Sequence, residues 1–279
     1  LQFTKGTTDF GASDAPMIDE VLKKASIEIY HIPTVLGAVG VSYNLPEVSE
    51  SLKFSAKTLV KIFTGEIKKW DHPELKKDNP NLELPDRYII VTHRSDGSGT
   101  TAVFTDFLSK VSPNWQKNVG QGKSIRWPTG LGGKGNEGVT GLIRQNPGAI
   151  GYVEMTYAIS NDLPLAAIEN KAGDFVRPTV ASVSRAATGA LKTIPEDYRV
   201  SITNAAGKGS YPVSAFTYLL VKKTMQGPKG RKLVDFLEWA LGPGQELAPE
   251  LKYAPLPEPL VEKVEQTVQS IQVQNVQDS

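Results

Sequence analysis

The stretch RYIIVTHRSDGSGTTAVFTDFLSKV, residues 87–111, places a strand, a turn and a helix in immediate succession. An apolar run typical of a buried strand leads to Arg94, and a glycine-containing turn follows it. Beyond the turn, apolar side chains recur at helical spacing, at Phe104, Phe107, Leu108 and Val111. This spacing predicts the apolar face of a helix that ends at Pro113. Open α/β sheets bind their ligands at such strand-to-helix turns.

The turn concentrates hydrogen-bond donors at one point. The start of a helix carries unpaired backbone N–H groups and the positive end of the helix dipole, so Ser98, Gly99 and Thr100 are predicted to donate to an anion. Arg94 adds a planar guanidinium suited to a tetrahedral oxyanion. A structural alternative stays open, in which Ser98 or Asp96 only caps the helix and Arg94 only pairs with Asp96.

A second acid, Asp14 in the segment GASDAP of residues 11–16, is predicted to follow another buried strand. A carboxylate repels a fully deprotonated anion, but it can accept a hydrogen bond from an anion that still carries a proton. Hydrogenphosphate has such a proton, whereas sulfate at neutral pH does not. Sites that demand a hydrogen-bond partner reject ligands lacking it by roughly 10⁴–10⁵-fold. Asp14 is therefore predicted to select phosphate, and Asp96 to hold Arg94 in position.

Short β-rich runs alternate with helical patterns along the rest of the chain, which predicts an α/β fold with largely parallel sheets. Strands are predicted at residues 8–13, 32–44, 87–94, 124–128, 148–155 and 214–223, with a hairpin at 166–178. Helices are predicted at residues 56–63, 136–145, 156–162, 179–188, 229–241 and 258–271. Residues 71–86 are predicted to be a polar connection, and residues 272–279 a polar tail.

The composition narrows the class of protein. Among 279 residues, 31 Lys and Arg balance 30 Asp and Glu, so no nucleic-acid surface or polybasic membrane anchor is indicated. The absence of cysteine excludes disulfides and thiolate metal sites, and His31, His72 and His93 lack metal-ligand spacing, so no cofactor or metal is predicted. No run is apolar enough to cross a bilayer and no signal peptide opens the chain, so it is expected to be cytoplasmic, mature or trimmed.

Motifs for enzyme chemistry are weak. The segment GKGNEG at residues 133–138 matches a dinucleotide-binding pattern, but no tight strand-to-turn approach precedes it, so a structural role at the start of a helix is predicted. The same segment has Gly135 where a P-loop needs Ser or Thr. Ser98 sits in G-S-G and not in the G-x-S-x-G of a nucleophile elbow, so the chain is predicted not to be an enzyme.

Several segments together resemble one family. They are DFGASDAP, GEIKKWDHPEL, RSDGSGTTAVFTDFLSKV, WPTGLGGKGNEGV, NPGAIGYVE and YPVSAFTYLLV, which lie between residues 9 and 221. The resemblance as a whole extends from about residue 9 to about residue 265. In this order they resemble the periplasmic phosphate-binding proteins of high-affinity phosphate ABC transporters. The resemblance implies a two-lobed periplasmic-binding-protein fold, with a hinge of two crossing strands and a ligand cleft between the lobes. It further implies that residues 1–44 and 215–279 form the first lobe and residues 45–214 the second.

By the same resemblance, phosphate is bound between Asp14 on one lobe and Arg94, Ser98, Gly99 and Thr100 on the other. The implied partners are inorganic phosphate and the transmembrane permease of a phosphate ABC transporter. The protein is expected to be a monomer that binds no nucleic acid. It is expected to be periplasmic, or on the outer face of the cell membrane if it is lipidated.

The sequence departs from the family at its start. The glycine-rich segment G-A-G-A-T-F-P and a later serine-glycine turn, which supply further phosphate contacts in the family, do not occur. About the first forty residues of the first lobe are therefore expected to be missing, which would expose an edge of its sheet. Two alternatives stay open: a phosphate-ester enzyme that uses the same anion cradle, and a truncated fragment that no longer binds ligand.

Overall fold

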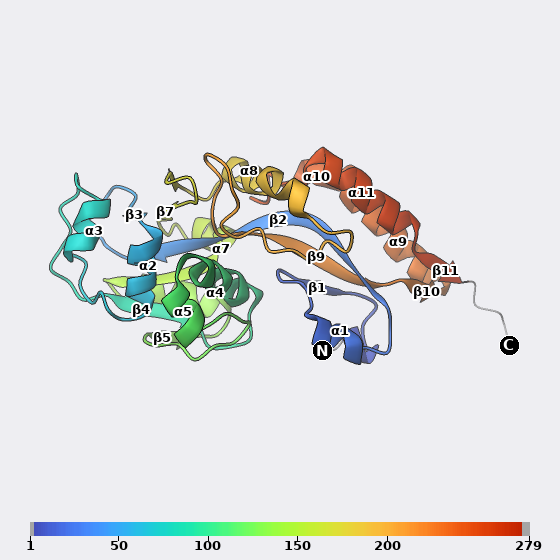
Figure 1. Cartoon of the computed structure of the whole chain (residues 1–279), viewed down its shortest axis with the longest axis horizontal. Coiled ribbons are helices and arrows are strands. Elements are labelled where there is room, and N and C mark those ends of the chain that lie inside the picture. The colour runs from blue at the N-terminus through green and yellow to red at the C-terminus, as the bar shows by residue number, and fades with distance from the viewer. Residues whose placement is uncertain (1–2, 275–279) are drawn as a thin grey trace.

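Two lobes lie side by side along the long axis of the molecule (Figure 1). The structure is a computed structural model that describes residues 3–274. Two long strands, β2 (Ile29–Tyr43) and β9 (Ser214–Lys222), connect the lobes. Most residues of both strands are buried, because each is paired on both edges and covered by other elements. The predicted α/β architecture with two lobes and two connecting strands is confirmed.

One six-stranded sheet runs through both lobes in the order β1-β9-β2-β6-β4-β5. From Ile29 to Ala38, β2 pairs with β9, and from Val39 to Tyr43 it pairs with β6 (Ala149–Glu154). The chain leaves the first lobe along β2 and returns along β9, so these neighbours are antiparallel. The prediction of largely parallel sheets is therefore wrong at the hinge, and within this sheet it holds only where β4 pairs with β5 and β6.

The first lobe, here meaning the part built around residues 3–28 and 223–274, has a small strand at the sheet edge and a group of C-terminal helices. β1 pairs with β9 alone, and β10 and β11 form a separate parallel pair. The elements are η1 (Phe3–Lys5), β1 (Gly11–Ser13), α1 (Asp19–Lys24), β10 (Thr224–Gln226), α9 (Gly227–Leu241), α10 (Gly244–Leu247), α11 (Glu258–Gln269) and β11 (Gln272–Gln274).

The second lobe carries the strand, turn and helix with which the sequence analysis began. They are β4 (Ile90–Arg94) and α4 (Gly99–Val111), separated by the turn 95–98. The other elements are β3 (Lys53–Phe54), α2 (Ala56–Phe63), α3 (Pro73–Asp78), α5 (Pro113–Asn118), β5 (Leu131–Gly133), α6 (Gly135–Gln145), α7 (Met155–Ser160), β7 (Ala167–Glu169), β8 (Phe175–Val176), α8 (Val180–Ala190) and η2 (Leu191–Thr193).

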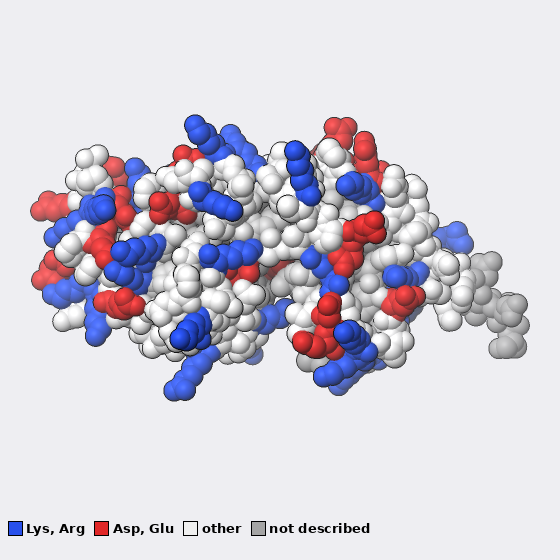
Figure 2. Space-filling view, in the orientation of Figure 1, with Lys and Arg blue, Asp and Glu red and all other residues white. Residues whose placement is uncertain are grey.

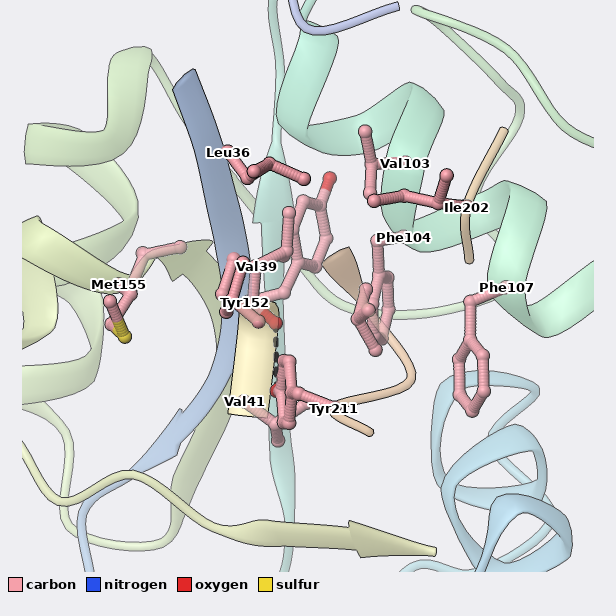
Figure 3. Close-up of a cluster of buried hydrophobic side chains, with 14 of the residues drawn as sticks. Leu36, Val39, Val41, Val103, Phe104, Phe107, Tyr152, Met155, Ile202 and Tyr211 are labelled. Atoms are coloured by element: carbon pink, nitrogen blue, oxygen red, sulfur yellow. Dashed lines mark hydrogen bonds between the residues drawn. The ribbon is translucent and has the colours of Figure 1, made fainter. Parts of the chain in front are cut away.

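Aromatic side chains pack at the centre of the second lobe and hold α4 against the sheet. The rings of Phe104 and Tyr152 are stacked with centroids 4.5 Å apart, and both are fully buried. Figure 3 shows these rings near Val39 and Val41 of β2, with Tyr211 donating its hydroxyl to the carbonyl of Val39 at 2.9 Å. Tyr152 of β6 thus holds α4 against the sheet that also contains the connecting strand β2.

Three local predictions are corrected. Residues 124–128 do not form a strand, because Trp127 is held by stacking on His93, with ring centroids 4.8 Å apart, and β5 takes the place beside β4. The connection 71–86 contains α3, which Pro73 opens. Part of the polar tail, residues 272–274, forms β11, while residues 275–279 lie outside the described part.

The division of the chain into residues 1–44 plus 215–279 and residues 45–214 stays a prediction. The pairing partner of β2 changes between Ala38 and Val39, and β9 begins at Ser214.

Among residues 3–274 no helix is long and apolar enough to cross a membrane.

Candidate functional site

A cleft of about 900 Å³ lies between the lobes. The first lobe contributes β1 and the turn that follows it, and the second contributes the side of α4 and the segment 121–123. The connecting strand β9 and the segment 200–203 line it as well. The cleft is far larger than a tetrahedral anion, so an anion held by the predicted residues would occupy only the end where Asp14 meets α4.

Asp14 lies against the first residue of α4. Its Oδ1 accepts a hydrogen bond from the hydroxyl of Thr217 in β9 at 3.0 Å. A methyl group built on Gly99 would lie 2.7 Å from its Oδ2, so the glycine permits this close approach. The structure therefore brings the acid of the first lobe to the helix start of the second, where unpaired N–H groups and the helix dipole favour negative charge.

At the start of α4, one of the predicted donors, the backbone N–H of Ser98, already has a partner within the protein. Ser98 is the N-cap residue, and its Oγ accepts the backbone N–H of Thr101 at 3.2 Å. The backbone N–H of Ser98 donates to the carbonyl of Lys123 at 2.8 Å, so the prediction that it faces a ligand is wrong. Within residues 3–274 the backbone N–H groups of Gly99 and Thr100 take no partner, and the hydroxyl proton of Ser98 stays available.

Arg94 and Asp96 form a two-point ion pair. The Nε of Arg94 donates to one carboxylate oxygen of Asp96 at 2.8 Å, and its Nη2 donates to the other at 2.6 Å. The guanidinium and the backbone N–H of Gly135, 3.0 Å from Oδ1, hold the pKa of Asp96 well below its usual range. Asp96 thus fixes the guanidinium plane, while Nη1 of Arg94 takes no partner among the described residues.

Asp14 and Arg94 open onto different cavities. Arg94 and Asp96 line a smaller one, of about 270 Å³, together with His93 and Trp127. No hydrogen bond or ion pair within residues 3–274 joins Asp14 to Arg94. The structure therefore assembles two half-sites, Asp14 with the start of α4 and Arg94 with Asp96, on either side of the turn 95–98.

Lys123 links these half-sites, and the sequence analysis missed it. Its side chain lines both cavities, and its Nζ donates to the hydroxyl of Ser13 in β1 at 3.1 Å. Its carbonyl holds the N–H of Ser98. The sequence signal was a lysine in a glycine-containing loop, directly before the predicted strand at 124–128.

On the face of the molecule shown in Figure 2, positive and negative side chains are mixed. Figure 2 shows Lys and Arg side chains intermingled with Asp and Glu over the visible face of both lobes. Within the described residues, no group of three or more His, Cys, Asp and Glu side chains could hold a metal ion. Selectivity for an anion would therefore come from a few placed donors and not from a broad positive field.

Comparison with protein families and curated proteins gives one consistent result. A family model described as a PBP superfamily domain matches residues 1–243. The phosphate-binding protein PstS of Pasteurella multocida is 46% identical over 266 residues, which cover 95% of this chain and 77% of that protein. The phosphate-binding protein PstS of Methanocaldococcus jannaschii is 41% identical, with 92% and 72% covered.

Solved structures support the same fold at lower identity. A high-affinity periplasmic phosphate-binding protein determined with bound phosphate superimposes with a TM-score of 0.72 at 19% identity, covering 93% of this chain and 78% of that one. A phosphate-binding protein from Stenotrophomonas maltophilia gives 0.70 at 17% identity, with 94% and 79% covered. At these identities the similarity concerns the fold alone.

Proposed function

Since the chain belongs to the PBP superfamily, and within it to the phosphate-binding proteins of the PstS type, we propose that it binds inorganic phosphate between its two lobes. It then delivers the anion to the transmembrane permease of an ABC importer. Relatives are named as binding proteins, so the proposal includes no catalytic step. It places the protein in the periplasm, or on the outer face of the membrane if it is lipidated, and takes it as a monomer.

The observation that carries the proposal is the position of Asp14 at the start of α4. In the proposed complex, phosphate sits between the two half-sites. The backbone N–H groups of Gly99 and Thr100 and the hydroxyl of Ser98 donate to it from the helix start. Arg94 donates through Nη1, because its other nitrogens are occupied by Asp96.

Asp14 has the opposite role, since it accepts a hydrogen bond from the ligand. Its Oδ1 already accepts from Thr217, so Oδ2, the oxygen nearest Gly99, is the one that faces the anion. Hydrogenphosphate offers a proton to this oxygen. Sulfate would leave two anionic oxygens opposed, and an unsatisfied buried polar group costs about 1–3 kcal/mol, or more when it is charged. The site therefore distinguishes the two anions by protonation and not by size.

The proposal is tested by calorimetric titration of the chain with phosphate and with sulfate at neutral pH. Phosphate is expected to bind and sulfate to bind far more weakly. The Asp14→Asn variant loses an acceptor for the ligand's proton, so its phosphate affinity should fall by about 10- to 100-fold, the equivalent of a hydrogen bond to a charged group. Its sulfate affinity should stay equal or rise, because the amide does not repel the anion.

Asp235→Asn is the matched control, since this aspartate lies exposed on α9 away from the cleft and its neutralisation should leave both affinities unchanged. Equal affinities of the wild-type chain for phosphate and sulfate would contradict the role of Asp14. Absence of phosphate binding by the wild-type chain would contradict the proposed function itself.

A further inference from the structure

A second carboxyl group, that of Glu154, lies where the connecting strands pass between the lobes. Glu154 is the last residue of β6 and stands opposite Val39, the first residue of β2 to leave β9 and pair with β6. Its Oε2 accepts the backbone N–H of Thr156 at 2.9 Å and also the hydroxyl of that residue, so one oxygen caps α7. Oε2 of Glu154 therefore has a structural role, as the cap of α7.

The other oxygen has no partner. Oε1 of Glu154 is buried and makes no hydrogen bond within the described residues. It lies beside Gly37 of β2, 3.7 Å from the point where a Cβ of that glycine would stand. The ring of Tyr253, from the first lobe, comes within 3.4 Å of the same point. A carboxyl group of one lobe and a phenol of the other thus meet over a glycine of the connecting strand.

The charges around Glu154 disfavour its ionised form. Burial raises its pKa, and the nearby negative charge of Asp14 raises it further. Burial, together with the charges of Glu154 and Asp14, also raises the pKa of Tyr253 to about 12, so its phenol stays neutral. The remaining titratable neighbour is Tyr157, whose own pKa is raised by Glu137, by burial and by Glu154.

We infer that Glu154 is a second proton-binding carboxyl, located beside the connecting strand β2, neutral when the lobes are closed on the anion and ionised when they open. The inference rests on the proposed function, because it concerns the same ligand. Closure brings Tyr253 of the first lobe over Oε1 and removes water from it, so the carboxylate takes one proton from solvent onto Oε1. The closed cleft then holds the anion and Asp14 without a third negative charge beside them.

The direction of the resulting pH dependence follows from linkage. A group whose pKa is raised in the closed form binds more protons there than in the open form, so it favours closure below its raised pKa. As the pH rises through that pKa, the contribution is lost and the affinity for the anion falls. Each unit by which closure raises the pKa corresponds to about a tenfold change in affinity.

The test compares the phosphate affinity of the wild-type chain and the Glu154→Gln variant from about pH 4, below the usual pKa of a glutamate, to about pH 8.5. The amide keeps the size and the capping oxygen of the side chain but cannot ionise. The affinities should agree within about twofold at the lower pH, and the variant should bind about tenfold more tightly at the higher pH. Ionisation of phosphate itself is common to both proteins and cancels in the ratio.

Glu169→Gln is the matched control, because Glu169 also accepts a backbone N–H, that of Ala56 at 3.2 Å, but it belongs to the separate sheet of β3, β7 and β8 and not to the strands that connect the lobes. Its affinity ratio to wild type should not change with pH. A second readout, calorimetry in two buffers of different ionisation enthalpy, should show that the wild-type chain takes up more protons on binding phosphate than the ionisation of the ligand explains. This measurement needs no variant, so the inference stays testable if Glu154→Gln does not fold.

An affinity ratio that stays flat with pH, or proton uptake fully explained by the ligand, would overturn the role of Glu154 while leaving phosphate binding intact. Loss of phosphate binding in the wild-type chain at every pH would overturn the proposed function instead.

Discussion

At the scale of single residues, Gly99 and Asp14 approach each other so closely that one methyl group would disturb both. The ideal Cβ position on Gly99 lies 2.7 Å from Oδ2 of Asp14 and 3.1 Å from its Cβ, so the whole side chain would have to move and not only its end. The backbone of Gly99 is not strained, because it is the first residue of α4 and has no positive φ. The glycine is needed for space.

Gly99→Ala should therefore weaken phosphate binding without harming the fold. Displacement of Asp14 is an overpacking effect of about 1–3 kcal/mol, which corresponds to an affinity loss of roughly 10- to 100-fold. The helix itself should gain up to about 1 kcal/mol, since alanine is the better helix former. Calorimetric titration measures the affinity, and chemical unfolding measures the stability.

Gly141→Ala in α6 is the matched substitution, because a Cβ there meets nothing within 4 Å. It should stabilise its helix and leave the affinity unchanged. If Gly99→Ala bound phosphate as tightly as this control, the contact between Asp14 and α4 would have no part in binding.

At the scale of elements, the sequence was informative where structure depends on neighbours along the chain. Ser55 caps α2, and that helix spans the predicted residues 56–63, because capping and amphipathic spacing are local properties. The turn between β4 and α4 was located by the same kind of signal. Contacts between distant segments have no such local signal. The carbonyl of Lys123 accepts from Ser98 and its side chain reaches Ser13, although Lys123 lies in a loop outside every predicted element.

The segment 124–128 was predicted as a strand but is irregular. Trp127 is partly buried and is held by stacking on His93 and Tyr152, and not by pairing along a sheet edge. Likewise α3 was hidden in a polar connection, because its six residues bury only Leu75 and give no periodic pattern. In both segments, packing against residues distant in the sequence determines the local structure.

The hydrogen bond between His31 and the backbone of Met17 should make the free energy of unfolding depend on pH. His31 of β2 is 3% exposed, and its Nε2 accepts the backbone N–H of Met17, 3.0 Å away in the segment that follows Asp14. Burial, aided by the charge of Arg199 and opposed by that of Asp197, lowers the pKa of His31 from 6.5 to about 4. The folded protein therefore keeps this histidine neutral at pH values where the unfolded chain protonates it.

Because the unfolded chain binds the extra proton, the free energy of unfolding should fall as the pH decreases from about 6.5 towards 4. The contribution of His31 is complete above pH 6.5, and its loss should approach about 3 kcal/mol below pH 4. His31→Gln keeps an acceptor for Met17 but cannot ionise. Urea unfolding followed by circular dichroism should give curves for the two proteins that diverge over this range. Parallel curves would show that His31 does not titrate on unfolding.

At the scale of the whole molecule, the account requires the lobes to move relative to each other. Asp14 and α4 belong to different lobes, so a ligand that needs both favours the closed form by its difference in affinity for the two forms. Only β2, β9 and the segments beside them connect the lobes in Figure 1. The hydrogen bond from Lys123 to Ser13 joins the lobes and is exposed, which suits a reversible clamp.

Closure can be followed with spin labels, because the natural sequence contains no cysteine. Lys77→Cys in α3 and Glu262→Cys in α11 place labels on exposed residues at opposite ends of the molecule (Figure 1). Phosphate should shift and narrow the distribution of label distances, whereas sulfate should not. A pair within the second lobe, Lys77→Cys with Lys117→Cys, should show no change. Identical distributions with and without phosphate would mean that binding does not require closure.

The most direct test of the central claim is a diffraction experiment on crystals grown with phosphate. One anion should lie between the lobes, at about 2.7–3.1 Å from the backbone nitrogens of Gly99 and Thr100 and within the same reach of Nη1 of Arg94. On its opposite side, a carboxylate oxygen of Asp14 should lie at hydrogen-bond distance from one phosphate oxygen. Phosphate bound elsewhere, or bound at the helix start with Asp14 turned away from it, would contradict the account.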